Sequence, residues 1–335
     1  MATPGANESD RHAAVVYNPT KVDLARLRES VNAAASAAGW AETEWFPTST
    51  SDPGQQATRD ALAAGAALVI AAGGDGTVRA VAEALRGGGV RLAIVPSGTG
   101  NLLARNLGLP LTSLTEATAI AFGGKDMPID VGVASVTTAD GETGDHAFLV
   151  MAGLGLGAEM FVKTKPGLKK RVGWLAYVDA GVRVIPRAEP FRIRYSLGGR
   201  GEHQAHVSTI LIANCGLLPG NLQFLPDARL DDGILDIAML HPRDVFGWLM
   251  IWRRVTWENG VLRRWAAGRE IIRRTEPVNE RLMTTLRGPD IRISVDEPQE
   301  FELDGDGFGK MRAVRLRADR HALTVRVPAK AAAPG

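Results

Sequence analysis

The sequence predicts an α/β N-terminal domain with a Rossmann-like, parallel sheet, followed by a predominantly β domain. Up to about residue 128, short apolar runs alternate with polar or glycine-rich turns and helical periods, which is the pattern of strands joined by crossover helices. From Ile129 this alternation ceases and β-patterned stretches dominate. We therefore expect one domain over residues 1–128 and a second over residues 129–320. In residues 321–335, a late strand from Ala322 to Val327 can return to the first domain, and a tail follows it.

The first elements can be taken from the apolar pattern in order. Ala13 to Tyr17 is a short apolar strand, and Asn18-Pro19-Thr20 is the turn after it. Apolar residues from Leu24 to Ala38 then fall on one helical face, and Gly39 ends that helix. The elements predicted next are a strand at Glu42 to Phe46, a polar loop at Thr48 to Gly54 and a helix at Ala57 to Ala64.

The stretch from Ala67 to Arg105 contains two strands that are each followed by a glycine loop. Leu68 to Ala72 is a continuous apolar run, typical of a buried parallel strand, and Gly73-Gly74-Asp75-Gly76-Thr77 interrupts it before a helix that ends near Leu85. Leu92 to Val95 is the second strand, and Pro96-Ser97-Gly98-Thr99-Gly100-Asn101 is the second loop. Both loops leave the carboxyl ends of parallel strands, where open α/β folds bind ligands. The helices predicted after them begin at Leu102 and at Ser113.

Two such loops on consecutive strands predict a polyphosphate clamp, although one alone could be a turn that binds nothing. Glycines let backbone N–H groups approach a phosphate, and each following helix offers its positive N-terminal end. Neither loop contains GxxxxGK, so the clamp would depend on backbone amides, Thr77, Thr99 and a metal. Asp75 would repel a phosphate unless a divalent cation lies between them or it takes the proton of the attacking hydroxyl.

GGDGT followed by PSGTGNLLAR resembles the diacylglycerol kinase catalytic domain, which bacterial lipid kinases, sphingosine kinases and ceramide kinases share. GGDG alone also occurs in NAD kinases and 6-phosphofructokinases, but the second segment separates the lipid kinases from these. The resemblance extends from Asn18-Pro19 to the Leu303-Asp304-Gly305-Asp306 segment and implies that the β domain is a sandwich. It also implies ATP contacts from Asn18, Thr50, Gly73, Gly74, Asp75, Gly76, Thr77, Gly98, Thr99 and Asn101. Thr48 is the alternative to Thr50, and either hydroxyl could instead cap the next helix.

The acidic stretch from Pro226 to Asp236 has two interpretations. It could be an exposed Asp-Gly turn before a strand at Ile234 to Leu240. Clustered carboxylates and turn carbonyls are also the oxygen ligands that Mg²⁺ prefers. The resemblance implies a chiefly structural metal site, in which Asp232 is a ligand together with the backbone carbonyls of Arg229 and Ile234.

Phe301 to Gly307 is a third informative segment. By its residues it is a candidate hairpin tip. It resembles the family's DGE segment, whose acids face the GGDGT loop and supply the catalytic base, but Asp306 replaces the glutamate. The catalytic candidates are therefore Asp304 and Asp306 for the base, with Asp75 near Mg²⁺-ATP. The reaction would depend mainly on positioning and charge neutralisation.

The β-patterned part contains a predicted hairpin, Ile129 to Val136 and His146 to Met151, and later strands at Phe191 to Leu197 and Gln204 to Ala213. Three patterns in the chain lack the context that their chemistry needs. Gly153 to Ala158 fits a dinucleotide fingerprint, but Pro166 prevents a long crossover helix. His203 and His206 would face opposite sides of a strand, which argues against a shared metal ion. Ser97 lacks the GxSxG elbow that a hydrolase nucleophile needs.

Composition and two basic segments indicate the cellular compartment and a candidate contact with a membrane. The chain has 335 residues, a net charge of +2 and one cysteine, Cys215, which excludes an intramolecular disulfide and fits a reducing cytoplasm. Its polar start lacks the apolar region of a signal peptide, and no run of eighteen apolar residues occurs. Two basic-aromatic segments, Lys163 to Tyr177 and Phe246 to Trp265, are either core helices with solvated edges or an interfacial membrane surface.

Taken together, these patterns predict an ATP-dependent lipid kinase that uses Mg²⁺. We expect it to be cytoplasmic, peripherally associated with anionic membranes, without a nucleic-acid partner, and open to homodimer formation. Diacylglycerol is the expected acceptor, and sphingoid bases, ceramide or another lipid are alternatives. An NAD kinase-like or sugar-phosphate kinase, and a non-catalytic nucleotide- or lipid-binding regulator, remain the competing interpretations.

Overall fold

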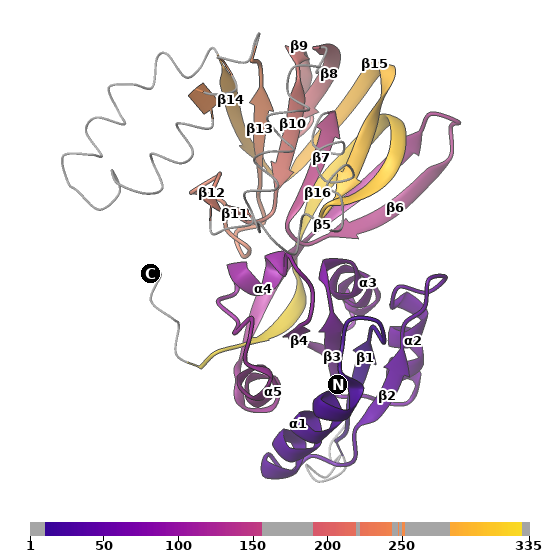
Figure 1. Ribbon diagram of the computed structural model, residues 1–335. Coiled ribbons are helices and arrows are strands. Elements are labelled where there is room, and N and C mark those ends of the chain that lie inside the picture. The colour runs from indigo at the N-terminus through magenta and orange to yellow at the C-terminus, as the bar shows by residue number, and fades with distance from the viewer. Residues whose placement is uncertain are drawn as a thin grey trace, which may run out of the picture. The chain divides into compact units, whose positions relative to one another are not determined.

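The computed structural model describes residues 11–155, 190–218, 222–242, 247, 250–251 and 282–329 (Figure 1). The chain divides into two compact units. One contains the described residues up to Val131 and those from Arg320 on, and the other extends from Gly132 to Asp319. Two strands, β5 (Lys125–Thr138) and β16 (Asp306–Val327), contain residues of both units.

The first unit is built on a parallel sheet in the order β16-β4-β3-β1-β2. At one side, Thr324 of β16 pairs with Arg91. β1 and β3 are buried along their whole length, as their continuous apolar sequences predict. The other bounds are Ala13–Tyr17 for β1, Glu44–Pro47 for β2, Leu68–Gly73 for β3 and Arg91–Pro96 for β4.

Helices cover both faces of this sheet. α1 (Leu24–Ala37) and α5 (Leu114–Gly123) share a core with the side chains of one face, including Val15, Ile70 and Val95. α2 (Gln55–Ala63) and α3 (Asp75–Leu85) pack on strands β1, β3 and β4, on the face that carries Val16. α4 (Leu102–Asn106) is a short helix after the second glycine loop. The predicted α/β domain is confirmed.

The second unit is β-rich, and one long strand, β15 (Asp290–Leu303), pairs along its length with two different neighbours, β8 and β7. The first part of β15 pairs with β8, and its last residues pair with β7. The change follows an irregularity between Ser294 and Gln299, the kind of bulge that bends a strand. The remaining bounds are β6 Thr143–Phe148, β7 Met151–Gly155, β8 Phe191–Leu197, β9 Arg200–Val207, β10 Thr209–Ala213, β11 Leu217–Leu218, β12 Leu222–Gln223, β13 Leu235–Leu240 and β14 Met283–Gly288.

The strands on the β8 side and those on the β7 side of β15 contribute to one buried core. It contains Phe148 and Phe301, which are fully buried, with Ile193, Ile237 and Leu316 around them. Residues that alternate with these along the strands face outwards, as for Arg192 and Arg194 on either side of Ile193. This alternation is typical of a sandwich whose inner faces pack together.

Several predicted bounds are wrong for a physical reason. The run from His146 to Met151 is two strands, because the backbone N–H groups of Leu149 and Val150 donate to Asp304 instead of joining a ladder. The run from Gln204 to Ala213 is also two strands, which separate at Ser208. The basic-aromatic segment at residues 163–177 lies outside the described residues, and only residues 247, 250 and 251 of the other segment are described.

Candidate functional site

The first glycine loop is shorter than the sequence predicts. β3 ends at Gly73, Gly74 caps the next helix, and Asp75 already begins α3, so Gly76 and Thr77 lie in its first turn. The first intrahelical bond is donated by the N–H of Val78 to the carbonyl of Gly74 (3.0 Å). The first N–H groups of an α-helix have no partner within the helix, and they carry its positive dipole end. The predicted residues therefore form a helix start suited to an anion.

The second loop is closed by the side-chain amide of Asn101. Its Oδ1 accepts from the N–H of Gly98 (3.0 Å), and its Nδ2 donates to the carbonyl of the same residue (3.0 Å). Asn101 has φ 48°, a left-handed conformation that asparagine tolerates better than most residues, and it precedes α4. Thr99, between these residues, is exposed.

The carboxylate of Asp75 joins the two loops. One oxygen accepts from the backbone N–H of Asn101 (2.9 Å), and the other accepts from the N–H of Leu102. Asp75 thus caps the N-terminus of α4 while standing in the first turn of α3, and its charge faces the positive ends of both helices. This bridging role was not visible in the sequence, where Asp75 appeared as an isolated acid beside a phosphate.

The loop glycines are needed mainly because the loops lie against each other. A Cβ on Gly98 would lie 2.7 Å from the Cα of Gly74, and one on Gly100 would lie 2.6 Å from Oδ2 of Asp75. A Cβ on Gly74 would be 3.5 Å from the Cα of Gly98, an ordinary contact, and the φ of Gly74 is −90°. Packing therefore explains Gly98 and Gly100 but leaves Gly74 unexplained.

The other residues assigned to ATP lie at the carboxyl ends of β1 and β2. The Asn18 side chain accepts from the backbone N–H (3.0 Å) and hydroxyl (2.8 Å) of Thr20 and so shapes the turn after β1. Thr48 is buried, whereas Thr50 is exposed. Neither threonine caps the next helix, because Asp52 accepts from the N–H groups of Gly54, Gln56 and Ala57. Burial alone would raise the pKa of Asp52, but these three bonds and Arg59 lower it.

A hollow of about 260 Å³ adjoins the second loop at the end of β4 and was not predicted. Its polar lining includes Lys21, Arg26 and Ser97. The N–H of Ser97 donates to the carbonyl of Gly73 (2.8 Å), which places this side of the hollow beside the first loop. Its apolar lining includes Val22, Leu27, Val95 and Leu114.

In the second unit, the acidic segment forms the turn between β15 and β16, so the hairpin prediction is confirmed. Asp304, with φ 51° and 7% exposure, accepts from the N–H groups of Leu149 (2.9 Å), Val150 (2.8 Å) and Met151 (3.0 Å). Asp306 begins β16 and is exposed. The two candidates for the base thus differ: Asp304 braces the connection between β6 and β7, and Asp306 faces solvent.

A third acid of this hairpin, Glu302, was missed. It is 1% exposed, and neither carboxylate oxygen has a hydrogen-bond partner among the residues that the structure describes. Burial, followed by the charges of Asp304 and Asp306, raises the pKa of Glu302 to about 8. Its side chain lies over Gly153, where any Cβ would collide with the carboxylate. Gly153, the first glycine of the segment that fits a dinucleotide fingerprint, therefore makes room for a buried carboxyl group.

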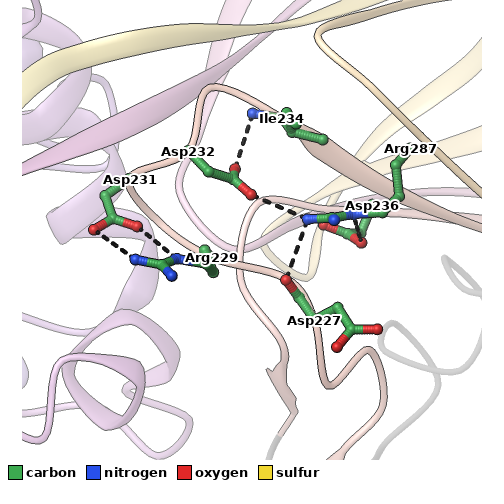
Figure 2. A network of polar contacts seen from close by, with 7 residues as sticks. All are labelled: Asp227, Arg229, Asp231, Asp232, Ile234, Asp236 and Arg287. Atoms are coloured by element: carbon green, nitrogen blue, oxygen red, sulfur yellow. Dashed lines mark hydrogen bonds and ion pairs between the residues drawn. The ribbon is translucent and has the colours of Figure 1, made fainter.

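The acidic turn before β13 is held by Arg287 of β14 (Figure 2). Its guanidinium donates to Oδ2 of Asp232 (3.0 Å), Oδ1 of Asp236 (2.8 Å) and the carbonyl of Asp227 (3.2 Å). Burial raises the pKa of Asp236, and the bond from Arg287 only partly offsets this effect. A cation from the chain itself therefore crosslinks the turn to the neighbouring strand.

The metal ligand set implied by the resemblance, Asp232 with the backbone carbonyls of Arg229 and Ile234, stays a prediction, and the Asp232 carboxylate already has partners from the chain itself. Oδ1 of Asp232 accepts from the N–H of Ile234 (3.0 Å), and its other oxygen accepts from Arg287. The Arg229 side chain pairs with Asp231 (3.1 Å). Within the described ranges, no group of three His, Cys, Asp or Glu side chains could hold a metal ion. The same part of the chain contains no helix that is long and apolar enough to cross a membrane.

Two family models match the chain. The model described as diacylglycerol kinase catalytic domain matches residues 12–134, and the model described as YegS C-terminal NAD kinase beta sandwich-like domain matches residues 150–256. The order of the two matches agrees with an α/β domain followed by a β sandwich.

Relatives and solved structures match along most of the chain. A Pseudomonas aeruginosa protein named "Probable lipid kinase YegS-like" is 33% identical over 307 residues, which cover 90% of each chain. A Bacillus subtilis protein named "Diacylglycerol kinase" is 25% identical over 319 residues, covering 93% of this chain and 95% of the other. A crystal structure of a diacylglycerol kinase from Bacillus anthracis has a TM-score of 0.66 at 19% identity, covers 95% of this chain and 97% of its own, and supports the fold alone.

Proposed function

Because the chain belongs to the lipid kinase family that contains the diacylglycerol kinase catalytic domain, we propose that it phosphorylates diacylglycerol to phosphatidic acid with ATP. The observation that carries this proposal is the pair of glycine loops that Asp75 ties together beside the start of α3. A helix start next to a closely packed glycine turn is a general solution for binding phosphate.

For the donor, we propose that the ATP phosphates lie at the start of α3, near the backbone N–H groups of Gly76 and Thr77. Thr99 is exposed at the neighbouring loop and can donate its hydroxyl, and Asn18 and Thr50 lie at the same sheet edge. The hollow beside Ser97 offers apolar walls for the rest of the nucleotide. Mg²⁺ would enter with ATP and neutralise the phosphate charge during transfer.

For the acceptor, we propose that Asp306 takes the proton of the lipid hydroxyl. Its carboxylate is exposed, whereas three backbone N–H groups bind Asp304 and give it a structural task. Asp304 would then hold the hairpin in place for Asp306. This division of roles predicts that Asp306→Asn lowers turnover by roughly 10²–10⁴-fold without a change in melting temperature.

The donor and acceptor are tested by incubating the protein with radiolabelled ATP and, in separate reactions, lipid vesicles that contain diacylglycerol, ceramide or a sphingoid base, or else soluble NAD or a sugar. Label in phosphatidic acid, lost in Asp306→Asn, is the expected result. Label in another lipid would move the acceptor assignment within lipid kinases. Label in NAD or a sugar phosphate would favour a small-molecule kinase, and no ATP consumption with any acceptor would favour a regulator.

The proposed acceptor lies in a bilayer, so we also propose reversible contact with anionic membranes from the cytoplasmic side. The two basic-aromatic segments remain predictions for this contact, as does a homodimer.

A further inference from the structure

The second unit carries a basic hollow on the outer face of its sheet. Inward residues of β8 and β15, such as Ile193 and Ile293, are buried in the core, so the residues that alternate with them face outwards. Between these outward side chains lies a hollow of about 400 Å³, lined by Arg194, Arg292 and Arg315. Hydroxyl side chains from β5, β6, β8 and β15 complete its wall.

Strand register brings two of the arginines directly opposite each other. Arg292 of β15 pairs with Arg315 of β16 on one side and with Ser196 of β8 on the other. Like charges at directly opposed positions destabilise a sheet. Arg292 therefore faces a like charge across the ladder, and of the two arginines only Arg315 has an acidic partner within the described residues.

The three guanidinium groups are not equally neutralised. Arg315 pairs with Asp290 (2.6 Å), and Arg194 pairs with Asp296 (3.3 Å). The side chain of Arg292 is exposed, and its guanidinium makes no hydrogen bond or ion pair with any residue of the described ranges. Glu202 of β9 is the acidic side chain among the lining residues, so the lining itself has more positive than negative charge.

This combination is suited to an oxyanion. A guanidinium presents a planar fork that matches the oxygens of a phosphate, and neighbouring hydroxyls can donate to the remaining oxygens. Ser196 and Ser294 lie beside Arg292, on the neighbouring strand and two residues along its own strand. An anion seated between Arg292 and Arg315 would also offset their mutual repulsion.

We propose that this hollow binds a phosphate-type anionic group through Arg292, with Ser196, Ser294 and Arg315 as its neighbours. The group can be carried by an anionic lipid or by a soluble phosphate. All of these residues belong to the second unit, and none of them is among the residues that we propose to bind ATP or to take the proton of the lipid hydroxyl.

The test compares Arg292→Gln with Arg192→Gln, which removes an equally outward arginine of β8 that does not line the hollow. One arm measures cosedimentation with vesicles of phosphatidylcholine, with and without phosphatidic acid. The other measures the shift in melting temperature caused by inorganic phosphate against sodium chloride of equal ionic strength. Because both variants keep all other basic residues, their difference isolates the hollow from general attraction to anions.

We expect Arg292→Gln to weaken anion-dependent binding by at least about threefold relative to wild type, and Arg192→Gln to remain close to wild type. A loss confined to vesicles would identify the lipid as the source of the group, and a loss confined to inorganic phosphate would identify a soluble anion. Equal binding by wild type and Arg292→Gln in both arms, or equal losses in the two variants, would overturn the proposal.

Discussion

The carboxylates of the two units have different partners, although Asp75 of the first unit and Asp304 and Asp306 of the second were predicted to act in one reaction. In the first unit, the Asp75 carboxylate accepts from backbone N–H groups of the neighbouring loop and so holds the two glycine turns together. In the second unit, Asp304 accepts from backbone N–H groups and Asp232 accepts from Arg287, whereas Glu302 has no hydrogen-bond partner within the described part of the chain. An acidic motif in a sequence therefore does not say whether its charge is used for the fold or is left for chemistry.

The largest effect is expected for Asp75→Asn. The amide has one oxygen where the carboxylate has two, so it should not accept from both Asn101 and Leu102; the loops should lose their alignment, and one half-buried bond of about 1–2 kcal/mol should be lost. We expect turnover to fall by at least roughly 10²-fold, the cost of displacing bound reactants by about 1 Å. Steady-state kinetics and urea unfolding measure the two effects.

Asp52→Asn is the matched control, since Asp52 also caps a helix with its carboxylate but lies outside both glycine loops. It should lose similar stability and keep its turnover. If both variants lose turnover only in proportion to stability, Asp75 is a structural residue and takes no part in the reaction.

The second effect concerns Glu302 and pH. The pKa of this carboxyl is raised from an ordinary 4.5 to about 8 in the folded protein, so the native state binds the extra proton between these values. The stability that the folded protein gains by holding this proton is therefore fully present below about pH 4.5. It is lost as the pH rises through about 8, where the folded-state carboxyl ionises. No ionisable side chain of β7 faces it, and Asp304 and Asp306 are the charged groups that act on it.

Glu302→Gln should remove this pH dependence, because glutamine resembles the protonated acid. Relative to wild type, the variant should gain stability on the order of a few kcal/mol as pH rises from 5 to 8. Urea unfolding at several pH values measures the difference, and Glu297→Gln, an exposed acid of the same strand, is the control. Parallel curves for wild type and Glu302→Gln would show that the buried carboxyl is already ionised.

How much of each region could be predicted depends on how far apart the interacting residues lie along the sequence. The parallel sheet was predicted because its strands, turns and helices are local patterns. The bond from Asn101 to Asp75 joins residues 26 apart, and those from Leu149 to Met151 reach Asp304 across 153 to 155 positions. No local pattern specifies such partners, so the sequence named these acids without showing what binds them.

Glu302 shows a different reason for failure. It alternates with the apolar residues Phe301 and Leu303, which is the ordinary pattern of a polar side chain facing solvent. Its burial depends on Gly153, which lies opposite it on another strand and leaves space for the carboxyl group. Only the pairing of the two strands reveals this relation. Whether the predicted ATP and base residues act as proposed remains a prediction.

The third effect separates packing from ligand contact within the glycine loops. Gly98→Ala would place a methyl group 2.7 Å from the Cα of Gly74, so it should cost about 1–3 kcal/mol and weaken ATP binding by separating the loops. Gly74→Ala has room in the protein and should fold normally.

If phosphate approaches the backbone at Gly74, this second variant should still bind ATP at least about tenfold more weakly. Calorimetric titration with Mg²⁺-ATP and melting curves distinguish the two variants. Normal ATP affinity in Gly74→Ala would place the phosphates elsewhere on the sheet edge.

The smallest effect, and the sharpest contrast with Asp75, concerns the turn that Arg287 holds. Arg287 is 45% exposed as a side chain, so replacing it by methionine should cost only about 1 kcal/mol, although Asp236 beneath it is buried. The loss should leave the carboxylates of Asp232 and Asp236 without their cation, together with the carbonyl of Asp227. Hard oxygen groups in this arrangement attract a divalent ion, so Mg²⁺ or Ca²⁺ should raise the melting temperature of Arg287→Met more than that of wild type.

Arg317→Met, on β16, controls for the general effect of removing an arginine. A larger Mg²⁺ shift in wild type that disappears in Asp232→Ala would instead favour the metal site implied by the resemblance, with Arg287 as a neighbour of the metal rather than its substitute.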